Sequence, residues 1–168
     1  MASKNNQKKG KVEDGIRLRG FARLRICEYG PNGEPNHKIV SDSGWIGPNQ
    51  KTNIGFINFL NYVLGASAGS SLVAFAAVGT GGTPASSGAS LPGESMARKP
   101  TTYSAPSSTQ IQWIASWASS DCTGSFTVGN AGLYGHSSEV SLGFGISTPG
   151  QTWSTNQSLN LSYVLNLS

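Results

Sequence analysis

A long glycine-rich loop is the first stretch of the sequence whose composition could do chemistry. The apolar segment 72–78 carries no charged side chain and runs into a loop that contains Gly79, Gly81, Gly82, Pro84 and Gly88. A buried strand that leads into glycines is typical of phosphate-binding loops, because backbone N–H groups can then surround an anion. No Lys-Ser or Lys-Thr follows at the P-loop spacing, no G-x-G-x-x-G is completed, and no helical pattern begins after the loop. We therefore interpret the stretch as a buried strand and an architectural loop.

Residues that could act as nucleophiles, general bases or metal ligands are few and scattered. His37 and His136 are the two histidines, and no G-x-S-x-G motif accompanies them. The eight carboxylates form no D-x-D cluster, and Cys27 and Cys122 stand at no recognisable zinc spacing from the histidines. We predict a protein without catalytic residues, metal site or cofactor, and therefore not an enzyme.

The charge of the chain is concentrated near its N-terminus. Residues 1–25 hold eight basic and two acidic side chains, a net charge of +6, whereas the remainder carries −2. Charged residues make up 12% of the chain, about half of what is usual for a soluble domain. This distribution predicts a local contact between the N-terminal region and an anionic partner, and a domain whose neutral surface suits contact with other subunits.

Cellular location is predicted from what the sequence lacks. No N-terminal apolar run resembles a signal peptide, and no stretch approaches the roughly 20 apolar residues of a membrane span. We expect a protein made in the cytoplasm with no membrane contact. Cys27 and Cys122 could pair or remain free, and a reducing compartment favours free thiols.

The organisation along the chain predicts a flexible basic arm over residues 1–15 and a single domain over residues 16–168. From Ile16 a period of two places apolar side chains on one face of a strand and arginines on the other. The arginines of that face are Arg17, Arg19, Arg23 and Arg25. Four guanidiniums repel one another unless anions or a partner chain lie opposite, so both a solvated face and an interface remain open.

The remaining pattern predicts an all-β sandwich with one helix. Gly30 to Gly33 form a turn before a return strand at 38–40, and Thr52-Asn53 can cap a helix that ends at Gly65. Further strands are expected at 111–117, at 126–128 with a break at 129–132, at 140–146 and at 159–167. Trp113 and Trp117 are expected in the core. Seven or eight short strands with one helix favour a β-sandwich, most simply a jelly roll.

The order of short segments resembles a family of small structural proteins of tailed bacteriophages. Its motifs are Phe75-Ala76-Ala77-Val78-Gly79-Thr80-Gly81, Thr83-Pro84, Leu91 with Glu94 and Arg98, the strand 111–117, Val128-Gly129-Asn130-Ala131-Gly132-Leu133-Tyr134, and Gln157-Ser158-Leu159-Asn160-Leu161-Ser162-Tyr163. The similarity spans about residues 16–168 and leaves the arm outside. It implies a jelly-roll component of the virion that decorates capsids or joins tail parts, often as a trimer.

From this resemblance we expect a non-enzymatic capsid decoration or cement protein that binds the major capsid protein or other virion proteins as a homo-oligomer, with a trimer favoured. The residues expected to bind partners are Lys4, Lys8, Lys9, Lys11, Arg17, Arg19, Arg23, Arg25 and Leu91. A tail or collar adaptor, a fibre-attachment protein, and a coat protein whose basic arm contacts nucleic acid are the alternatives. A carbohydrate-binding or depolymerase module would need exposed aromatic side chains or paired carboxylates, which the sequence does not place.

Overall fold

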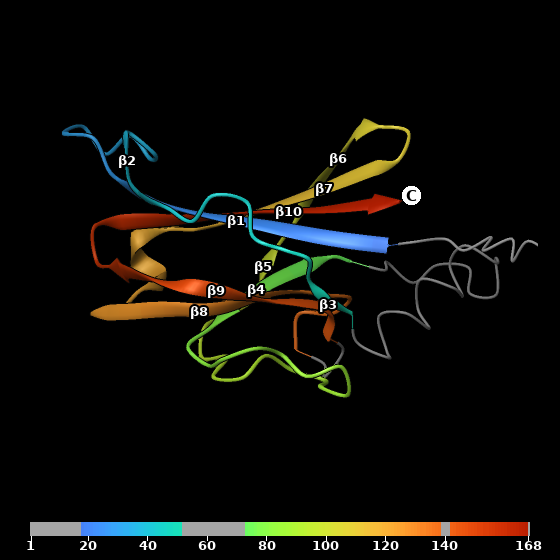
Figure 1. Cartoon of the computed structure of the whole chain (residues 1–168). Helices are drawn as coiled ribbons and strands as arrows, with labels where there is room; N and C mark the ends of the chain where they lie inside the picture. Colours follow the sequence, from blue (N-terminus) through green and yellow to red (C-terminus); the bar gives the residue numbers. More distant parts are fainter. Residues whose placement is uncertain (1–17, 52–72, 139–141, 168) are drawn as a thin grey trace, which may run out of the picture.

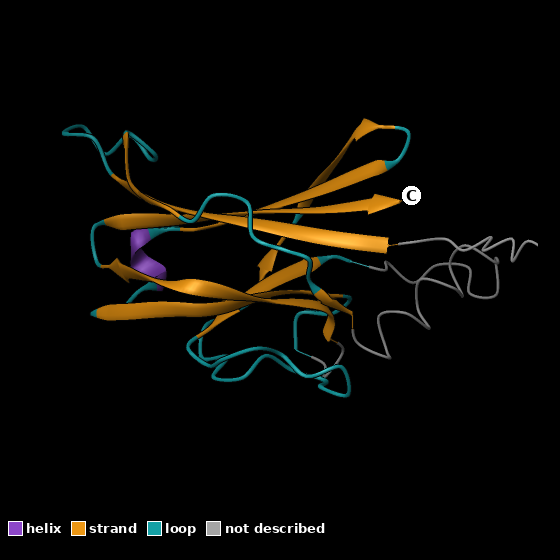
Figure 2. Cartoon of the chain, in the orientation of Figure 1, coloured by secondary structure: helices purple, strands orange, loops and turns teal. Residues whose placement is uncertain are grey.

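The chain folds into two five-stranded antiparallel sheets that pack face to face (Figures 1 and 2). The computed structural model describes residues 18–51, 73–138 and 142–167. Sheet A has the strand order β2-β1-β10-β7-β6, formed by β2 (Lys38–Asp42), β1 (Leu18–Glu28), β10 (Gln157–Leu167), β7 (Gln110–Trp117) and β6 (Thr102–Ser107). Sheet B has the order β3-β9-β8-β4-β5, formed by β3 (Gln50–Lys51), β9 (Leu142–Ser154), β8 (Ser125–Tyr134), β4 (Phe75–Gly79) and β5 (Lys99–Pro100). A short 3-10 helix, η1 (Ser119–Asp121), joins β7 to β8.

The period-two pattern of sheet A is confirmed. In β1 the side chains of Leu18, Ala22, Leu24 and Ile26 are at most 6% exposed, and their neighbours point outward. The whole of β1 pairs with β10, from Leu18 opposite Leu167 to Glu28 opposite Gln157. Because side chains alternate across a strand, this single register sends both apolar rows into the core together.

Sheet B contains the predicted buried strand, and it shows that one predicted strand break does not exist. β4 lies between β8 and β5, and Ala76, Ala77 and Val78 are at most 1% exposed. The predicted break at 129–132 is wrong, because β8 continues to Tyr134 with a register shift between Val128 and Asn130. Gly129 allows the backbone of β8 to lie close to the backbone of Gly81, because a Cβ at this position would lie 2.5 Å from the Gly81 carbonyl oxygen.

The core between the sheets is rich in aromatic side chains. Trp113 is 7% exposed and Trp117 is fully buried, as predicted, and Trp153 is also fully buried. The Trp117 Nε1–H donates to the Ala97 carbonyl oxygen at 3.2 Å, and the Trp153 Nε1–H donates to that of Gln157 at 2.7 Å. Both indoles therefore bury their rings without leaving a donor unpaired.

The fold class, an all-β sandwich, is confirmed, while the jelly-roll subtype stays a prediction. The turn at Gly30 to Gly33 and the return strand β2 are also confirmed; Gly33 has a φ of 82°, which favours glycine. The described residues contain no α-helix, and the helix expected over 52–65 lies outside them. The basic arm and Arg17 lie outside them as well.

Candidate functional site

The outer face of sheet B is covered by a loop of its own chain, residues 80–98, which lies beneath β4, β8 and β9 in Figure 1. Leu91 is 3% exposed and packs with Ala77, Tyr134 and Leu142 in a small second cluster. The prediction that Leu91 contacts a partner is therefore wrong, because its side chain is used to fasten the loop to this sheet. The sequence shows that Leu91 is isolated in a polar loop, but it does not show on which surface the loop lies.

Polar contacts hold this loop in place around Tyr134. The Tyr134 hydroxyl accepts a hydrogen bond from the Leu91 N–H at 2.7 Å and donates one to Glu94 Oε2 at 2.7 Å. The Arg98 guanidinium pairs with Glu94 at 2.7 Å and lies 3.4 Å from the centre of the Tyr134 ring. Burial, together with the Glu94 carboxylate, raises the pKa of Tyr134 above its usual value. The hydroxyl thus stays a neutral donor.

The glycine-containing part of the loop is also held in place by hydrogen bonds within the chain, and it does not form an anion site. The N–H groups of Thr80 and Gly81 donate to the carbonyl oxygens of Gly93 and Pro92 at 3.2 and 3.0 Å. The Asn130 side-chain amide donates to the carbonyls of Gly82 and Pro92 at 3.0 and 2.9 Å. Donors that would face a phosphate are already bonded within the chain, which agrees with the architectural interpretation of this loop.

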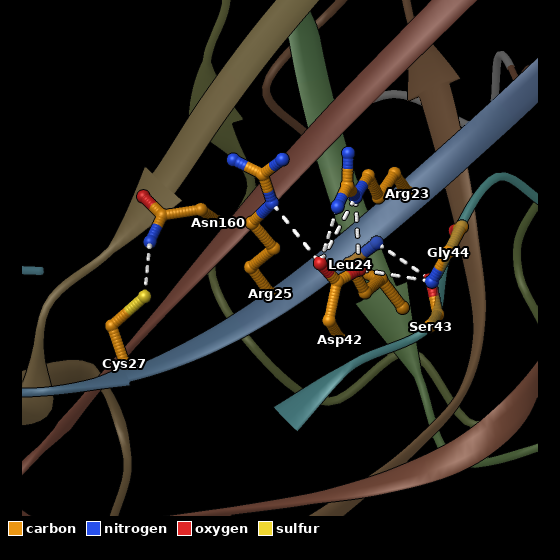
Figure 3. Close-up of polar contacts among 8 residues, drawn as sticks. All are labelled: Arg23, Leu24, Arg25, Cys27, Asp42, Ser43, Gly44 and Asn160. Carbon is orange, nitrogen blue, oxygen red and sulfur yellow. Dashed lines mark hydrogen bonds and ion pairs between the residues drawn. The ribbon is translucent and has the colours of Figure 1, made fainter. Parts of the chain in front are cut away.

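The outer face of sheet A carries the predicted arginines. Arg19, Arg23 and Arg25 all point outward from β1, and β2 supplies the carboxylate of Asp42 beside two of them (Figure 3). The Arg23 Nε–H donates to Asp42 Oδ1 at 2.8 Å, and the Arg25 Nε lies 3.4 Å from Asp42 Oδ2. Sequence reasoning left open what lies opposite these guanidiniums, and within the chain it is Asp42.

Asp42 is held in its ionised form by these neighbours. The hydrogen bonds from Arg23, with smaller contributions from the Gly44 N–H at 2.9 Å and from the charge of Arg25, keep the pKa of Asp42 well below its usual range. The side chains of Arg23 and Asp42 are 28% and 27% exposed, so the pair lies at the surface and is partly screened by solvent. Arg19 is exposed at the other end of the strand.

Exposed apolar side chains gather on sheet A. Among the described residues, the large hydrophobic side chains with substantial exposure are Ile39, Val40, Trp45, Tyr103, Ile111 and Ile114. All belong to β2, β6, β7 or the segment that follows β2, and none belongs to sheet B. We use the name β2 patch for Arg23, Arg25, Ile39, Val40 and Asp42. Within the described chain β2 is an edge strand, so its outer backbone groups are open to another strand.

A groove of about 400 Å³ lies on the outer face of sheet A. Its apolar lining consists of Phe21, Trp45, Pro106 and Val164, and its polar lining consists of Gln110, Gln112 and Asn166. The Trp45 side chain is 51% exposed. Sequence reasoning did not locate this groove. The available signal was a tryptophan between glycines in the irregular segment 44–50, where no strand pattern would bury it.

The residues considered for catalysis or metal binding form no such site in the described part of the chain. No group of three His, Cys, Asp or Glu side chains there could hold a metal ion. Cys27 and Cys122 are free and buried, and burial raises the pKa of both thiols, so both are weak nucleophiles at neutral pH. No helix of the described residues is long and apolar enough to span a membrane.

Comparison with known proteins gives no relative from which a function could be transferred. No protein-family model matches the chain, and no curated protein or solved structure matches it significantly. Evidence on function therefore comes from the two outer faces of the sandwich.

Proposed function

We propose that this chain is a non-enzymatic structural protein of a tailed-phage particle, which decorates the capsid shell as a homo-oligomer. The observation that carries the proposal is the one-sided distribution of exposed hydrophobic side chains, all of which lie on sheet A or the segment after β2. Tyr103 lies opposite Trp113 and Ile111 lies opposite Leu165, so these two belong to the core-facing row of sheet A, whereas Ile114 lies on its outer face. Exposed apolar side chains concentrated on one sheet are typical of a surface that meets a partner. The resemblance of the short segments to phage structural proteins supplies the class of partner.

The β2 patch is the proposed contact with the shell. Ile39 and Val40, 51% and 39% exposed, can be buried against a neighbouring protein. The open edge of β2 can accept a strand from that protein, and Arg23 and Arg25 can pair with its acidic groups, because two guanidiniums share the single carboxylate of Asp42. Each contact is small, and repetition over a symmetric shell gives the attachment its strength.

The location of the protein on purified particles tests this proposal. An antibody raised against the recombinant chain is expected to label heads in electron micrographs, and quantitative mass spectrometry is expected to find the chain in stoichiometric amounts. Labelling confined to tails or collars would contradict the decoration role and favour the adaptor alternative.

A pair of matched variants tests the contact surface. The double variant Ile39→Ser, Val40→Ser is expected to lower occupancy on stripped particles, because it removes the exposed apolar area of β2. Tyr103→Ser removes an exposed aromatic side chain from β6 and is expected to bind as the wild type does. Equal occupancy of the double variant and the wild type would exclude the β2 patch as the contact.

A further inference from the structure

The groove on the outer face of sheet A is built by strand register. Phe21 of β1 pairs with Val164 of β10, which pairs with Gln112 of β7, so these side chains form one row across three strands. The next row brings Asn166 beside Gln110. Ile39 of the β2 patch lies opposite Cys27, six residues along β1 from Phe21, or roughly 20 Å at the usual rise per residue. Arg23, at the near end of the patch, lies two residues from Phe21 on the same row of β1, so the groove and the patch adjoin along this strand.

The aromatic wall of the groove is fixed before any ligand arrives. Trp45 precedes Ile46, whose backbone N–H and carbonyl exchange hydrogen bonds with those of Ala22 at 2.8 and 2.9 Å. Gly47 allows the segment to lie against the Phe21 ring, since a Cβ there would meet that ring at 2.3 Å. An indole that is 51% exposed on a hydrogen-bonded backbone is an open, flat and preorganised surface.

The polar part of the groove consists of side-chain amides alone. The Gln110 Nε2–H donates to Asn166 Oδ1 at 2.8 Å, which orients both amides. The free groups of that pair, Gln110 Oε1 and Asn166 Nδ2, together with the Gln112 amide, present both acceptors and donors to the groove. Among the described residues, no acidic or basic side chain lines the groove, and Arg19, opposite Asn166, lies at its margin. Its ligand must therefore offer an apolar flat face and neutral groups that both donate and accept hydrogen bonds.

We propose that this groove is a binding site for a neutral polysaccharide. The C–H face of a sugar ring is flat and apolar and can stack on the Trp45 indole, while its hydroxyls match the mixed donors and acceptors of Gln110, Gln112 and Asn166. The volume of about 400 Å³ falls within the range of roughly 300–1,000 Å³ of small-ligand sites and suits a short segment of such a chain. This activity goes beyond attachment to a shell, because it gives the outer face of sheet A a ligand of its own.

Two other ligand classes fit the lining less well. Single-stranded nucleic acid would stack on Trp45, but it requires cations along its backbone; the described lining has none, and Arg19 and Arg23 lie only at the margin of the groove on β1. A proline-rich peptide requires a groove bounded by several aromatic ridges, whereas Phe21 and Trp45 are the aromatic side chains of the described lining and three amides make up its polar part. Both become outcomes of the test.

Affinity electrophoresis of the purified full chain tests the proposal. The chain is run in native gels that contain dextran, mannan, galactan, cellulose derivatives or soluble chitin oligosaccharides. At least one is expected to retard it, with no change between 50 and 500 mM salt when the same binding is followed in solution, because no charged group lines the groove. The emission of the exposed Trp45 is expected to shift on saturation, since Trp113, Trp117 and Trp153 are buried.

Variants link the binding to the groove. Trp45→Ala is expected to weaken binding roughly tenfold or more, and Gln112→Ala by a smaller factor. Tyr103→Ala is the matched control, because Tyr103 is 79% exposed and lies outside the lining, and it is expected to bind as the wild type does. Circular dichroism of each variant verifies that the fold is kept.

Four results would overturn the proposal: no retardation by any of these polysaccharides, unchanged binding by Trp45→Ala, binding that falls steeply with salt, or tighter binding of oligonucleotides or proline-rich peptides at the same groove. None of these results depends on where the protein sits on a particle. Failure of the groove and failure of the decoration role can thus be told apart.

Discussion

The chain covers the outer face of sheet B with one of its own loops and leaves apolar side chains exposed on sheet A. On sheet B, the loop 80–98 is fastened by Leu91 and by the hydrogen bonds of Tyr134, so the apolar side chains there are buried without a partner. On sheet A, Ile39, Val40, Trp45 and Ile114 remain at the surface. The comparison indicates that sheet B has its outer face covered by its own chain, whereas sheet A keeps apolar side chains exposed, which is the basis on which we propose that it binds.

The largest expected change in the free energy of unfolding comes from a substitution on the covered face, the outer face of sheet B. Leu91→Ala removes the central side chain of the second cluster and should lower the free energy of unfolding by about 2–3 kcal/mol, the lower part of the usual range for buried leucines. Urea denaturation measures this change. Ile114→Ala on the outer face of sheet A, where Ile114 is 40% exposed, is the control and should cost less than about 1 kcal/mol. Equal costs would show that the two faces are covered alike.

The second effect concerns the hydrogen bonds of the loop. Tyr134→Phe keeps the ring beneath Arg98 but leaves the Leu91 N–H without its acceptor, and Glu94 then keeps only the donors of Arg98. We expect a loss of about 1–2 kcal/mol, because an unpaired buried N–H retains its desolvation cost. Hydrogen exchange at Leu91 should accelerate at the same time. Unchanged exchange at Leu91 would mean that the apolar cluster alone fastens the loop.

The third effect is smaller and depends on pH. Asp42→Asn on the open face removes a surface ion pair that should contribute at most about 1 kcal/mol at pH 7. The folded-state pKa of Asp42 is lowered, so this contribution is present above the usual carboxyl pKa of about 3.9 and is lost as the pH falls towards the folded-state value. Denaturation of both proteins between pH 7 and pH 2 should show curves that converge below about pH 4. A difference in the free energy of unfolding that grows on acidification would contradict the predicted direction.

The smallest effect is expected at the proposed contact itself. Replacing Ile39 and Val40 by serine should change stability by no more than about 0.5 kcal/mol per site, because both side chains are exposed in the isolated chain. Thermal unfolding of the double variant measures this. A large loss would show that β2 uses these side chains for its own packing, and it would remove the argument for a partner on this edge.

Sequence periodicity was sufficient for the long strands of the fold, but not for the short edge strands β3, β5 and β6 or for the surfaces between distant segments. The alternation in β1 and β10 predicts both strands and their buried rows, because a period of two follows from the backbone of one strand. The pairing of Arg23 with Asp42, 19 residues away, depends on strand register, which no local pattern contains. The same holds for Leu91, whose partner Tyr134 lies 43 residues away.

Glycine and tryptophan were the residues whose roles the sequence left ambiguous. A glycine such as Gly129 indicates either a strand break or a close backbone approach, and only the neighbouring Thr80-Gly81 segment decides between them. Four tryptophans look equivalent in composition, yet Trp113, Trp117 and Trp153 are buried while Trp45 is half exposed. The difference follows from the local pattern: Trp113 and Trp117 occupy a regular strand, and Trp45 occupies an irregular segment.

Hydroxyl-radical footprinting of the protein, free and attached to particles, tests most directly the claim that sheet A binds and sheet B does not. In the free protein, Ile39, Val40 and Trp45 are expected to react readily, whereas Leu91 and Tyr134 react slowly. On particles, Ile39 and Val40 should become protected while Leu91 and Tyr134 remain as slow as before. Fast reaction of Leu91 in the free protein, or unchanged reactivity of β2 on particles, would contradict the account.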